Sequence, residues 1–372
     1  MEYRRYGQTD TLVSAIGLGG HREGMETRGG LARQATFHRS AQERARTVGA
    51  AIDAGITYFD STFGCEIASL GESLRLLGRR EGLFVSGMRV DFFGLRHEAG
   101  LSPAEYLRTE VEGRLSDSGL DYLDQFLLGA MEQGDPLGHQ AEMDEVMAEA
   151  ERLKQAGKIR YLGFSCHDPN YAAKLLRAFP FNAVMCPFNV SNRTAAGDLQ
   201  AAVEATGAAW VAMKSMVWRL YGIPASVLRH LRCEQLGLDA TTPVGTLAHR
   251  WLLDHPRLTT CVPAANYPAA IAENTAAADR GPLTDDERAL LDRWVEATAV
   301  HDHLPLALGG LLEDNLRVRV CSMGLASNRL GVATPPIDLD ADSAEEDARV
   351  AAELLLDAAR QDERWAALLP LA

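Results

Sequence analysis

Eight short apolar runs recur along the first 280 residues, and longer amphipathic stretches separate them. Each run is four to six residues long, rich in aliphatic and aromatic side chains, and not strictly alternating between apolar and polar residues. Continuous runs of this length are typical of parallel strands that are buried on both faces. The predicted strands are Ala15–Gly19, Thr57–Ser61, Leu83–Met88, Gln125–Leu128, Tyr161–Ser165, Ala183–Cys186, Trp210–Lys214 and Thr259–Pro263.

The stretches between these runs have the apolar spacing of amphipathic helices. The expected helices are Ala41–Ala54, Ile67–Arg79, Pro103–Ser116, Gln140–Gly157, Tyr171–Phe179, Ala195–Gly207, Pro243–His255 and Pro268–Ala278. Eight strands, each followed by a helix or a helix-bearing segment, predict an α/β fold of the (β/α)8 TIM barrel type. A doubly wound sheet is the competing architecture, but no GxGxxG pattern follows the first strand.

The 372 residues exceed the roughly 250 of a simple barrel, so we expect two parts. Residues 1–300, which end in the charged helix Leu283–Val300, form the barrel. Residues 301–372 form a C-terminal extension that packs on the barrel or on a partner subunit. The long, polar segment Gly20–Ser40 follows the first strand, so we expect it to fold over the barrel mouth and carry His21 toward the pocket.

The charge balance argues against two classes of partner. The chain has 37 basic and 51 acidic residues, a net charge of -14, which repels nucleic-acid phosphates and anionic lipids. No apolar run approaches the roughly 20 residues of a membrane span, and the start Met1–Arg5 lacks a signal-peptide core. The six cysteines include no closely spaced pair, which indicates reduced thiols rather than disulfides or a metal site. We therefore expect a cytoplasmic protein that binds a small molecule, with no metal and with the extension as the contact for any homo-oligomer.

Several motifs, in order along residues 3 to about 280, resemble those of the aldo-keto reductase superfamily. The motifs are Tyr3–Thr9, Val13–Ser14, Gly17–Gly19, Ala54–Ser61, Glu66–Leu74, Asp121–Asp124, Leu153–Lys154 with Gly157–Ser165, and Glu273–Asn274. The resemblance implies the same barrel. It also implies hydride transfer between NAD(P)H and a carbonyl group, assisted by a catalytic tetrad of Asp, Tyr, Lys and His.

By this resemblance, the chain has one of the four tetrad residues. Asp60 matches the family aspartate at the end of the second strand. Cys65 stands at the place of the tyrosine, Met88 at the place of the lysine and Gly129 at the place of the histidine. A thiol is a weak hydrogen-bond donor, and methionine and glycine carry no charge. The standard acid–base mechanism is therefore not expected to operate.

The resemblance also covers the positions that bind the cofactor in this family, and the chain matches the family residues mainly at the adenosine-phosphate end of the cofactor. Ser165 matches half of a Ser-Asn pair that anchors the nicotinamide carboxamide, whereas Cys166 replaces the asparagine and Met185 a glutamine. Lys214 matches a common family lysine, and Glu273 with Asn274 matches the final phosphate-binding stretch. The resemblance implies NADP as the cofactor. The site for its adenosine-phosphate end is partly preserved, and the site for its nicotinamide end is dismantled.

Catalytic residues of barrels lie at the carboxyl ends of the strands, and several polar residues fall there. The candidate acid–base residues are Asp60, His21, Glu66, Cys65 and His167. The same loops also hold Arg89, Asp91, Glu132 and Asp168. For the first three, a solvated loop residue is the better explanation, and for Asp168 a helix N-cap is. Without the lysine, Asp60 either pairs with Arg89 or has a pKa raised by desolvation, and the second case favours an acid–base role.

Three functions remain open. The replaced tetrad favours an enzyme that acts on a small, partly apolar molecule by non-redox chemistry, such as elimination, isomerisation or cyclisation. The alternative is an atypical NAD(P)H-dependent reductase or dehydrogenase with a substitute proton donor. A non-catalytic binding protein that keeps only the fold is the third, because barrels host many functions.

Overall fold

A closed parallel sheet lies at the centre of the computed structural model, which describes residues 1–20, 41–190, 192–215, 244–265 and 268–299. Eight parallel strands follow the order β10-β9-β8-β7-β6-β5-β4-β3. They are β3 (Leu18–Gly19), β4 (Tyr58–Ser61), β5 (Phe84–Arg89), β6 (Leu123–Leu128), β7 (Ile159–Ser165), β8 (Ala183–Pro187), β9 (Ala209–Met213) and β10 (Thr260–Cys261). Each overlaps one of the apolar runs identified in the sequence, so the strand predictions are confirmed.

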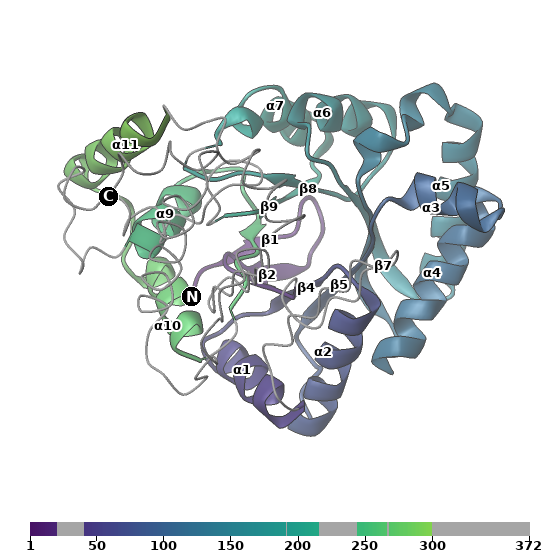
Figure 1. The fold of residues 1–372 in the computed structure, drawn as a ribbon, viewed down its shortest axis with the longest axis horizontal. Coiled ribbons are helices and arrows are strands. Elements are labelled where there is room, and N and C mark those ends of the chain that lie inside the picture. The colour runs from purple at the N-terminus through teal and green to yellow at the C-terminus, as the bar shows by residue number, and fades with distance from the viewer. Residues whose placement is uncertain (21–40, 191, 216–243, 266–267, 300–372) are drawn as a thin grey trace, which may run out of the picture.

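The first and last strands of the sheet meet and close it into a barrel. Parallel bridges join Ile16 to Cys261 and Gly19 to Ala264. The backbone N–H of Gly17 also donates to the carbonyl of Cys261 at 2.7 Å. The fold is therefore the predicted (β/α)8 barrel, and Figure 1 shows the helices arranged around the strands.

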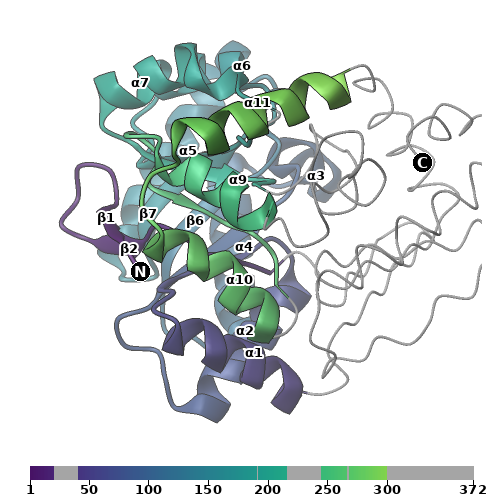
Figure 2. The same cartoon turned by 90° about the vertical axis from the view of Figure 1, so that its left-hand side faces the viewer.

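The helices form the outer layer of the barrel (Figures 1 and 2). They are α1 (Ala41–Asp53), α2 (Gly64–Leu77), α3 (Phe92–Ala99), α4 (Pro103–Ser118), α5 (Gln140–Gln155), α6 (Pro169–Ala178), α7 (Asp198–Thr206), α9 (Val244–Leu253), α10 (Pro268–Asp279) and α11 (Asp285–Ala299). The sequence pattern does not predict α3. Asp91 begins this helix in the left-handed conformation, with φ of 48°, and accepts a hydrogen bond from the N–H of Gly94 at 3.2 Å. Asp168 caps α6 as expected and accepts from the N–H groups of Asn170 and Tyr171.

Strand side chains form two apolar layers, one inside the barrel and one beneath the helices. Tyr58 and Phe84 belong to the interior cluster, whereas Phe59 and Val85, their chain neighbours, belong to the cluster under the helices. Successive side chains of a strand point to opposite faces. The position of a residue along its strand therefore decides whether it reaches the barrel interior.

An N-terminal hairpin covers the amino-terminal end of the barrel. Strands β1 (Tyr3–Arg5) and β2 (Leu12–Ser14) pair antiparallel. Tyr6 follows β1 and is fully buried, with its ring centroid 4.6 Å from that of Phe84 and 5.1 Å from that of Tyr161. These ring contacts close the bottom of the barrel interior.

Asp124 ties three strands together at the same end of the barrel. Its carboxylate is 1% exposed and accepts hydrogen bonds from Arg80 Nη2 at 2.8 Å and Arg160 Nη1 at 2.8 Å. The backbone N–H of Val85 donates a further bond at 2.9 Å. Burying a carboxylate is unfavourable unless it is paired and hydrogen-bonded, and here three donors meet that requirement.

Replacing this carboxylate should destabilise the barrel without changing its mouth. We expect Asp124→Asn to lower the free energy of unfolding by about 2 to 3 kcal/mol, near the low end for a broken buried pair because both arginines reach solvent. Urea unfolding followed by circular dichroism measures this change. Asp198→Asn, which breaks the exposed pair with Arg177, is the control and should leave the midpoint nearly unchanged. Equal effects of the two variants would contradict the structural role of Asp124.

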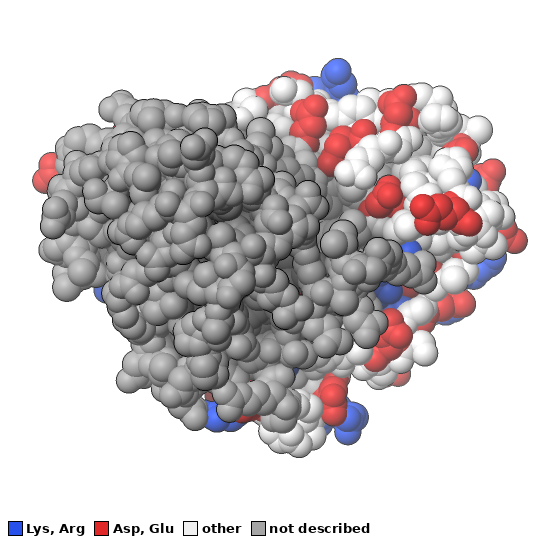
Figure 3. Space-filling model, viewed as in Figure 1, with Lys and Arg blue, Asp and Glu red and all other residues white. Residues whose placement is uncertain are grey.

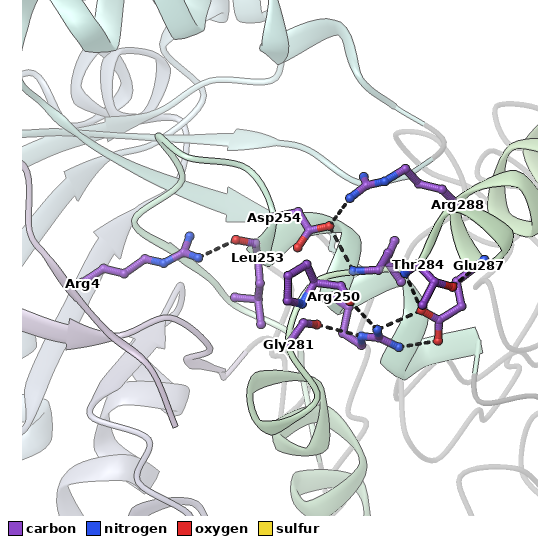
Figure 4. Close-up of polar contacts among 10 residues, drawn as sticks. Arg4, Arg250, Leu253, Asp254, Gly281, Thr284, Glu287 and Arg288 are labelled. Carbon is purple, nitrogen blue, oxygen red and sulfur yellow. Dashed lines mark hydrogen bonds and ion pairs between the residues drawn. The ribbon is translucent and has the colours of Figure 1, made fainter.

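Helix α11 is attached to the barrel by ion pairs and backbone contacts (Figure 4). The guanidinium of Arg250 on α9 binds both carboxylate oxygens of Glu287, at 2.6 and 2.8 Å, and its Nε donates to the carbonyl of Gly281 at 3.0 Å. Arg288 pairs with Asp254 at 2.5 Å. The expected helix Leu283–Val300 thus corresponds to α11 and is docked on the barrel.

Acidic side chains predominate over the described surface on the right of Figure 3, where α3, α4 and α5 lie, as the charge count suggests. Within the described residues, no helix has the length and apolar character needed to cross a membrane. Two expectations lie outside the described residues: the loop 21–40 with His21, and the extension 301–372.

Candidate active site

Asp60 lies inside the barrel near the carboxyl end of β4. It pairs in register with Gly19 of β3 and Ser86 of β5, and its side chain is 6% exposed. Burial raises the pKa of this carboxyl to about 7, while the nearby Ser86 hydroxyl and the Ser61 N–H oppose the shift. Its Oδ1 atom has no hydrogen-bond partner among the described residues. The carboxyl can therefore hold or release a proton near neutral pH.

Arg89 does not supply the missing cation. Its Nε donates to the hydroxyl of Tyr106 at 2.8 Å and lies 3.5 Å from Glu110, so the side chain points out of the barrel toward α4. Met88, one residue earlier, belongs to the interior cluster instead. Of the two alternatives for Asp60, the structure therefore favours the unpaired carboxyl.

The backbone at Gly129 leaves no space for a side chain. A Cβ atom there would lie 2.7 Å from the carbonyl oxygen of Arg89 and 2.8 Å from the Cα of Val90. The N–H of Gly129 donates to the same Arg89 carbonyl at 2.8 Å. The chain then turns through Ala130, which has a left-handed φ of 54°. A histidine is therefore excluded from this position by the backbone itself.

A substitution at Gly129 should show this constraint directly. We expect Gly129→Ala to lower the free energy of unfolding by about 1 to 3 kcal/mol, because the new methyl group meets backbone atoms that cannot move aside. Gly113 on α4 has open space around its Cα, so Gly113→Ala should stabilise the helix by about 0.5 to 1 kcal/mol. Thermal unfolding of both variants measures the contrast, and a neutral Gly129→Ala would show that the loop rearranges easily.

Glu66 and Cys65 both lie in the first turn of α2. The carboxylate of Glu66 is buried and accepts hydrogen bonds from the N–H of Thr62 at 2.6 Å and of Phe63 at 3.2 Å. These bonds satisfy backbone donors at the start of the helix. Cys65 is partly buried. The described contacts thus give Glu66 a helix-capping role, and its catalytic role stays a prediction, as does that of Cys65.

Glu132 and His167 meet at the barrel mouth. Glu132 lies in the short 3-10 helix Met131–Gln133 after β6, and His167 follows β7. His167 Nδ1 lies 2.9 Å from Glu132 Oε1. Burial opposes ionisation of Glu132, but the hydrogen bond from His167 prevails and lowers the pKa of Glu132 to about 2. The carboxylate is then ionised and only accepts, so the imidazole Nδ1 carries the donated hydrogen. The sequence places both residues just after neighbouring strands, but it gives no sign that they pair.

The two cysteines near this pair face away from the barrel interior. Cys166 and Cys186 are buried in the cluster beneath the helices, and Cys166 Sγ donates to the carbonyl of Asp168 at 3.1 Å. Burial raises the pKa of both thiols well above the ordinary range. Among the described residues, no three His, Cys, Asp or Glu side chains are grouped so as to hold a metal ion.

A model of the Aldo/keto reductase family matches residues 16–218 of this chain. The chain belongs to the aldo-keto reductase family. A curated relative, Aldo-keto reductase YhdN of Bacillus subtilis (strain 168), is 28% identical over 202 residues, which cover 52% of this chain and 55% of that protein. The match thus spans about half the length of that relative.

Solved aldo-keto reductases share the fold. The holo form of aldo-keto reductase AKR11C1 from Bacillus halodurans superposes with a TM-score of 0.60 and 22% identity, covering 79% of this chain and 96% of that one. An aldo-keto reductase from Klebsiella pneumoniae in complex with NADPH gives a TM-score of 0.58 and 22% identity, covering 79% and 95%. At this level of identity, the similarity establishes the barrel architecture alone.

The residues at the family's nicotinamide positions keep one polar group. Ser165 is buried, and its hydroxyl makes a single long contact among the described residues, 3.9 Å to Met213 Sδ. This weakly bonded, buried hydroxyl is available to a ligand. Met185 lies in the apolar interior, and Cys166 turns outward. Of these three positions, Ser165 therefore offers the hydroxyl, and its assignment to the nicotinamide end of a cofactor stays a prediction.

The residues at the family's adenosine-phosphate positions are polar and lie near the surface. Lys214 follows β9 in a left-handed conformation, with φ of 56°, and its carbonyl accepts from Asn189 Nδ2 at 2.9 Å. Glu273 is exposed and Asn274 half-buried on α10. These residue types fit the adenosine-phosphate end of NADP(H). The polar groups at these positions are therefore a lysine, a carboxylate and an amide at one end and a single hydroxyl at the other, and their assignment to a cofactor stays a prediction.

The buried carboxyl of Asp60 should impose a pH dependence on stability. Its pKa is about 7 in the folded protein against 3.8 for the ordinary group, so between these values the folded state binds more protons than the unfolded one. The free energy of unfolding therefore falls as pH rises through this range. We expect Asp60→Asn to be more stable than the wild type by about 2 to 4 kcal/mol at pH 8 and equally stable near pH 4.

Urea unfolding at several pH values measures this difference. Burial lowers the pKa of His249 to about 4, so this residue makes the free energy of unfolding rise with pH. The contribution is the same in the wild type and in Asp60→Asn, and it therefore cancels when the two proteins are compared. A stability difference that is constant with pH would show that Asp60 titrates normally.

Proposed function

We propose that this aldo-keto reductase is an NADP(H)-dependent oxidoreductase that interconverts a carbonyl and an alcohol on a small, partly apolar molecule, with Asp60 as the acid–base group. The family supports oxidoreductase chemistry, and the solved relative bound to NADPH supports the cofactor. The observation that carries the acid–base assignment is the unpaired, buried carboxyl of Asp60, with a pKa near 7. No lysine or histidine of the usual tetrad is needed to tune such a group.

Reduction of a carbonyl requires a proton at the oxygen that becomes the alcohol. A carboxyl with a pKa near 7 is partly protonated at neutral pH and can donate that proton, and it can accept one in the reverse direction. The apolar cluster in the same barrel interior, which includes Met88, Met185 and Val262, keeps bulk water away from the carboxyl and so favours its protonated form. NADP(H), when bound, supplies or accepts the hydride.

Four residues would hold the cofactor. Lys214, Glu273 and Asn274 would bind the adenosine-phosphate end, and the Ser165 hydroxyl would bind the nicotinamide end. At the rim, the Glu132–His167 pair presents an imidazole with a fixed tautomer. We assign it to orienting the substrate.

Non-redox chemistry remains the second candidate, and one observation favours it. Cys166 and Met185 cannot supply the amide contacts that hold a carboxamide, because Cys166 faces the helices and Met185 is apolar. A barrel that has lost the nicotinamide end of its cofactor site but keeps a titratable Asp60 is suited to elimination, isomerisation or cyclisation.

Binding of the cofactor separates the two candidates. Purified protein titrated with NADPH should show saturable quenching of tryptophan fluorescence, with weaker quenching by NADH. Ser165→Ala should weaken NADPH binding several-fold, because it removes the polar contact at the nicotinamide end. If neither nucleotide quenches the fluorescence, the oxidoreductase proposal fails and non-redox acid–base chemistry replaces it.

The role of Asp60 is tested in the same assay once NADPH-dependent turnover of a carbonyl panel is found. Carbonyl reduction should slow as pH rises through about 7, because Asp60 loses its proton. Asp60→Asn should lower turnover by about 100- to 10,000-fold and flatten the pH profile, with NADPH affinity unchanged. Asp168→Asn, which keeps the cap of α6, is the control and should behave as the wild type. Full turnover in Asp60→Asn would refute the acid–base role.

A further inference from the structure

Polar side chains of three adjacent strands lie next to one another inside the barrel. Asp60 of β4 is in register with Ser86 of β5, and Ser86 is in register with Gln125 of β6. Neighbouring strands are about 4.8 Å apart, so side chains at paired positions are neighbours. Ser86 and Gln125 are fully buried, like the phenol of Tyr58, which donates to Gln125 Oε1 at 2.8 Å.

Each of these three residues keeps one polar atom without a hydrogen bond. Asp60 Oδ1, Ser86 Oγ and Gln125 Nε2 are buried and have no partner in the part of the chain that the structure describes. Rotating the amide of Gln125 does not remove the mismatch, because it would free Oε1 and the hydroxyl hydrogen of Tyr58 instead. Buried polar groups are almost always hydrogen-bonded, either to protein or to water.

The three unmatched atoms have complementary chemistry. Gln125 Nε2 donates, a carboxylate oxygen accepts, and the Ser86 hydroxyl does either. One water molecule can accept from the amide, donate to the carboxylate and bond the hydroxyl, which is the two to four partners that a buried water requires.

We propose that a buried water molecule binds between Asp60, Ser86 and Gln125, and that Ser86 is the positioning residue for the proton of Asp60. The inference rests on the proposed function only in treating Asp60 as the acid–base group. When Asp60 is protonated, it donates a hydrogen bond to the water or to the Ser86 hydroxyl. When it is ionised, the Ser86 hydroxyl and the water rotate and donate to it. Ser86, Gln125 and the water thus form hydrogen bonds with both the protonated and the ionised carboxyl of Asp60, and the surrounding apolar side chains do not need to move.

The groups that face Asp60 are consistent with this arrangement. Tyr58 from its own strand and Tyr6 from the hairpin are the nearby phenols, and burial raises the pKa of each, so both stay neutral. Across the neighbouring strands, Gly19 has no side chain and Ser86 does not titrate. The carboxylate of Glu66 on α2 lies beyond Gly20, near the backbone of Asp60. Ser86 is therefore the side chain that adjusts to the charge of Asp60.

Infrared spectroscopy can follow the proton of Asp60 without any substrate. The difference spectrum between the wild type and Asp60→Asn identifies the carbonyl band of the protonated carboxyl, and a pH titration gives its midpoint. We expect Ser86→Ala to raise this midpoint by about one to two pH units, because the ionised carboxyl loses a donor. Ser86→Thr, which restores a hydroxyl, should return the midpoint toward the wild-type value.

Ser73→Ala is the matched control. Ser73 is fully buried on α2, and its hydroxyl donates to the Ser69 carbonyl, outside the barrel interior, so this variant should leave the midpoint unchanged. A crystal structure of the wild type should show a water within hydrogen-bond distance of Ser86 Oγ and Gln125 Nε2. An unchanged midpoint in Ser86→Ala, or the absence of that water, would overturn the inference.

These outcomes are distinct from a failure of the proposed function. If Ser86→Ala raises the midpoint while Asp60→Asn retains full turnover, the water site stands and the acid–base role of Asp60 is wrong. If Asp60→Asn abolishes turnover while Ser86→Ala leaves the midpoint unchanged, the acid–base role stands and the inference is wrong.

Discussion

Closure of the barrel between β3 and β10 is the constraint on which the candidate site depends. The seam is narrow because its first strand carries glycines: a Cβ atom on Gly19 would lie 2.9 Å from the carbonyl of Val262. Once the seam is closed, strands surround the side chains that point inward, and these side chains lose most of their contact with bulk water. The same closure that builds the core therefore raises the pKa of Asp60, because an ionised carboxyl there loses its solvation.

A comparison of Asp60 with Asp124 shows that the neighbouring groups determine whether a buried carboxyl is held ionised or can titrate. Both are almost fully buried on strands of the same barrel. Asp124 receives two guanidinium groups and a backbone N–H, and this makes it a fixed structural anion. Asp60 receives no cation from the described residues, and Arg89, the nearest in sequence, turns outward to Tyr106. The first carboxyl therefore holds strands together, whereas the second is free to titrate.

The sequence predicted the barrel well because burial on both faces leaves continuous apolar runs, and each run became a strand. It did not predict α3, whose start depends on the left-handed backbone at Asp91. It located Gly129 at the histidine position but could not show that the backbone of Arg89 fills the space of a side chain there. The sequence also could not predict that Arg89 points out of the barrel or that Glu132 pairs with His167. Both depend on which face of a strand or loop each residue occupies.

A buried carboxyl without a cation is unfavourable for folding at neutral pH, and an amide of the same shape would avoid that cost. Nothing in the described packing requires a carboxyl at position 60. Its Oδ1 makes no hydrogen bond there, and the neighbouring glycine and serine would accommodate an asparagine. Residues that lower stability in this way while having a perturbed pKa concentrate at functional sites. The position of Asp60, at the end of a barrel strand where catalysis takes place in this fold, agrees with that rule. The presence of a buried, titratable carboxyl at position 60 is therefore the observation on which the proposed acid–base role rests.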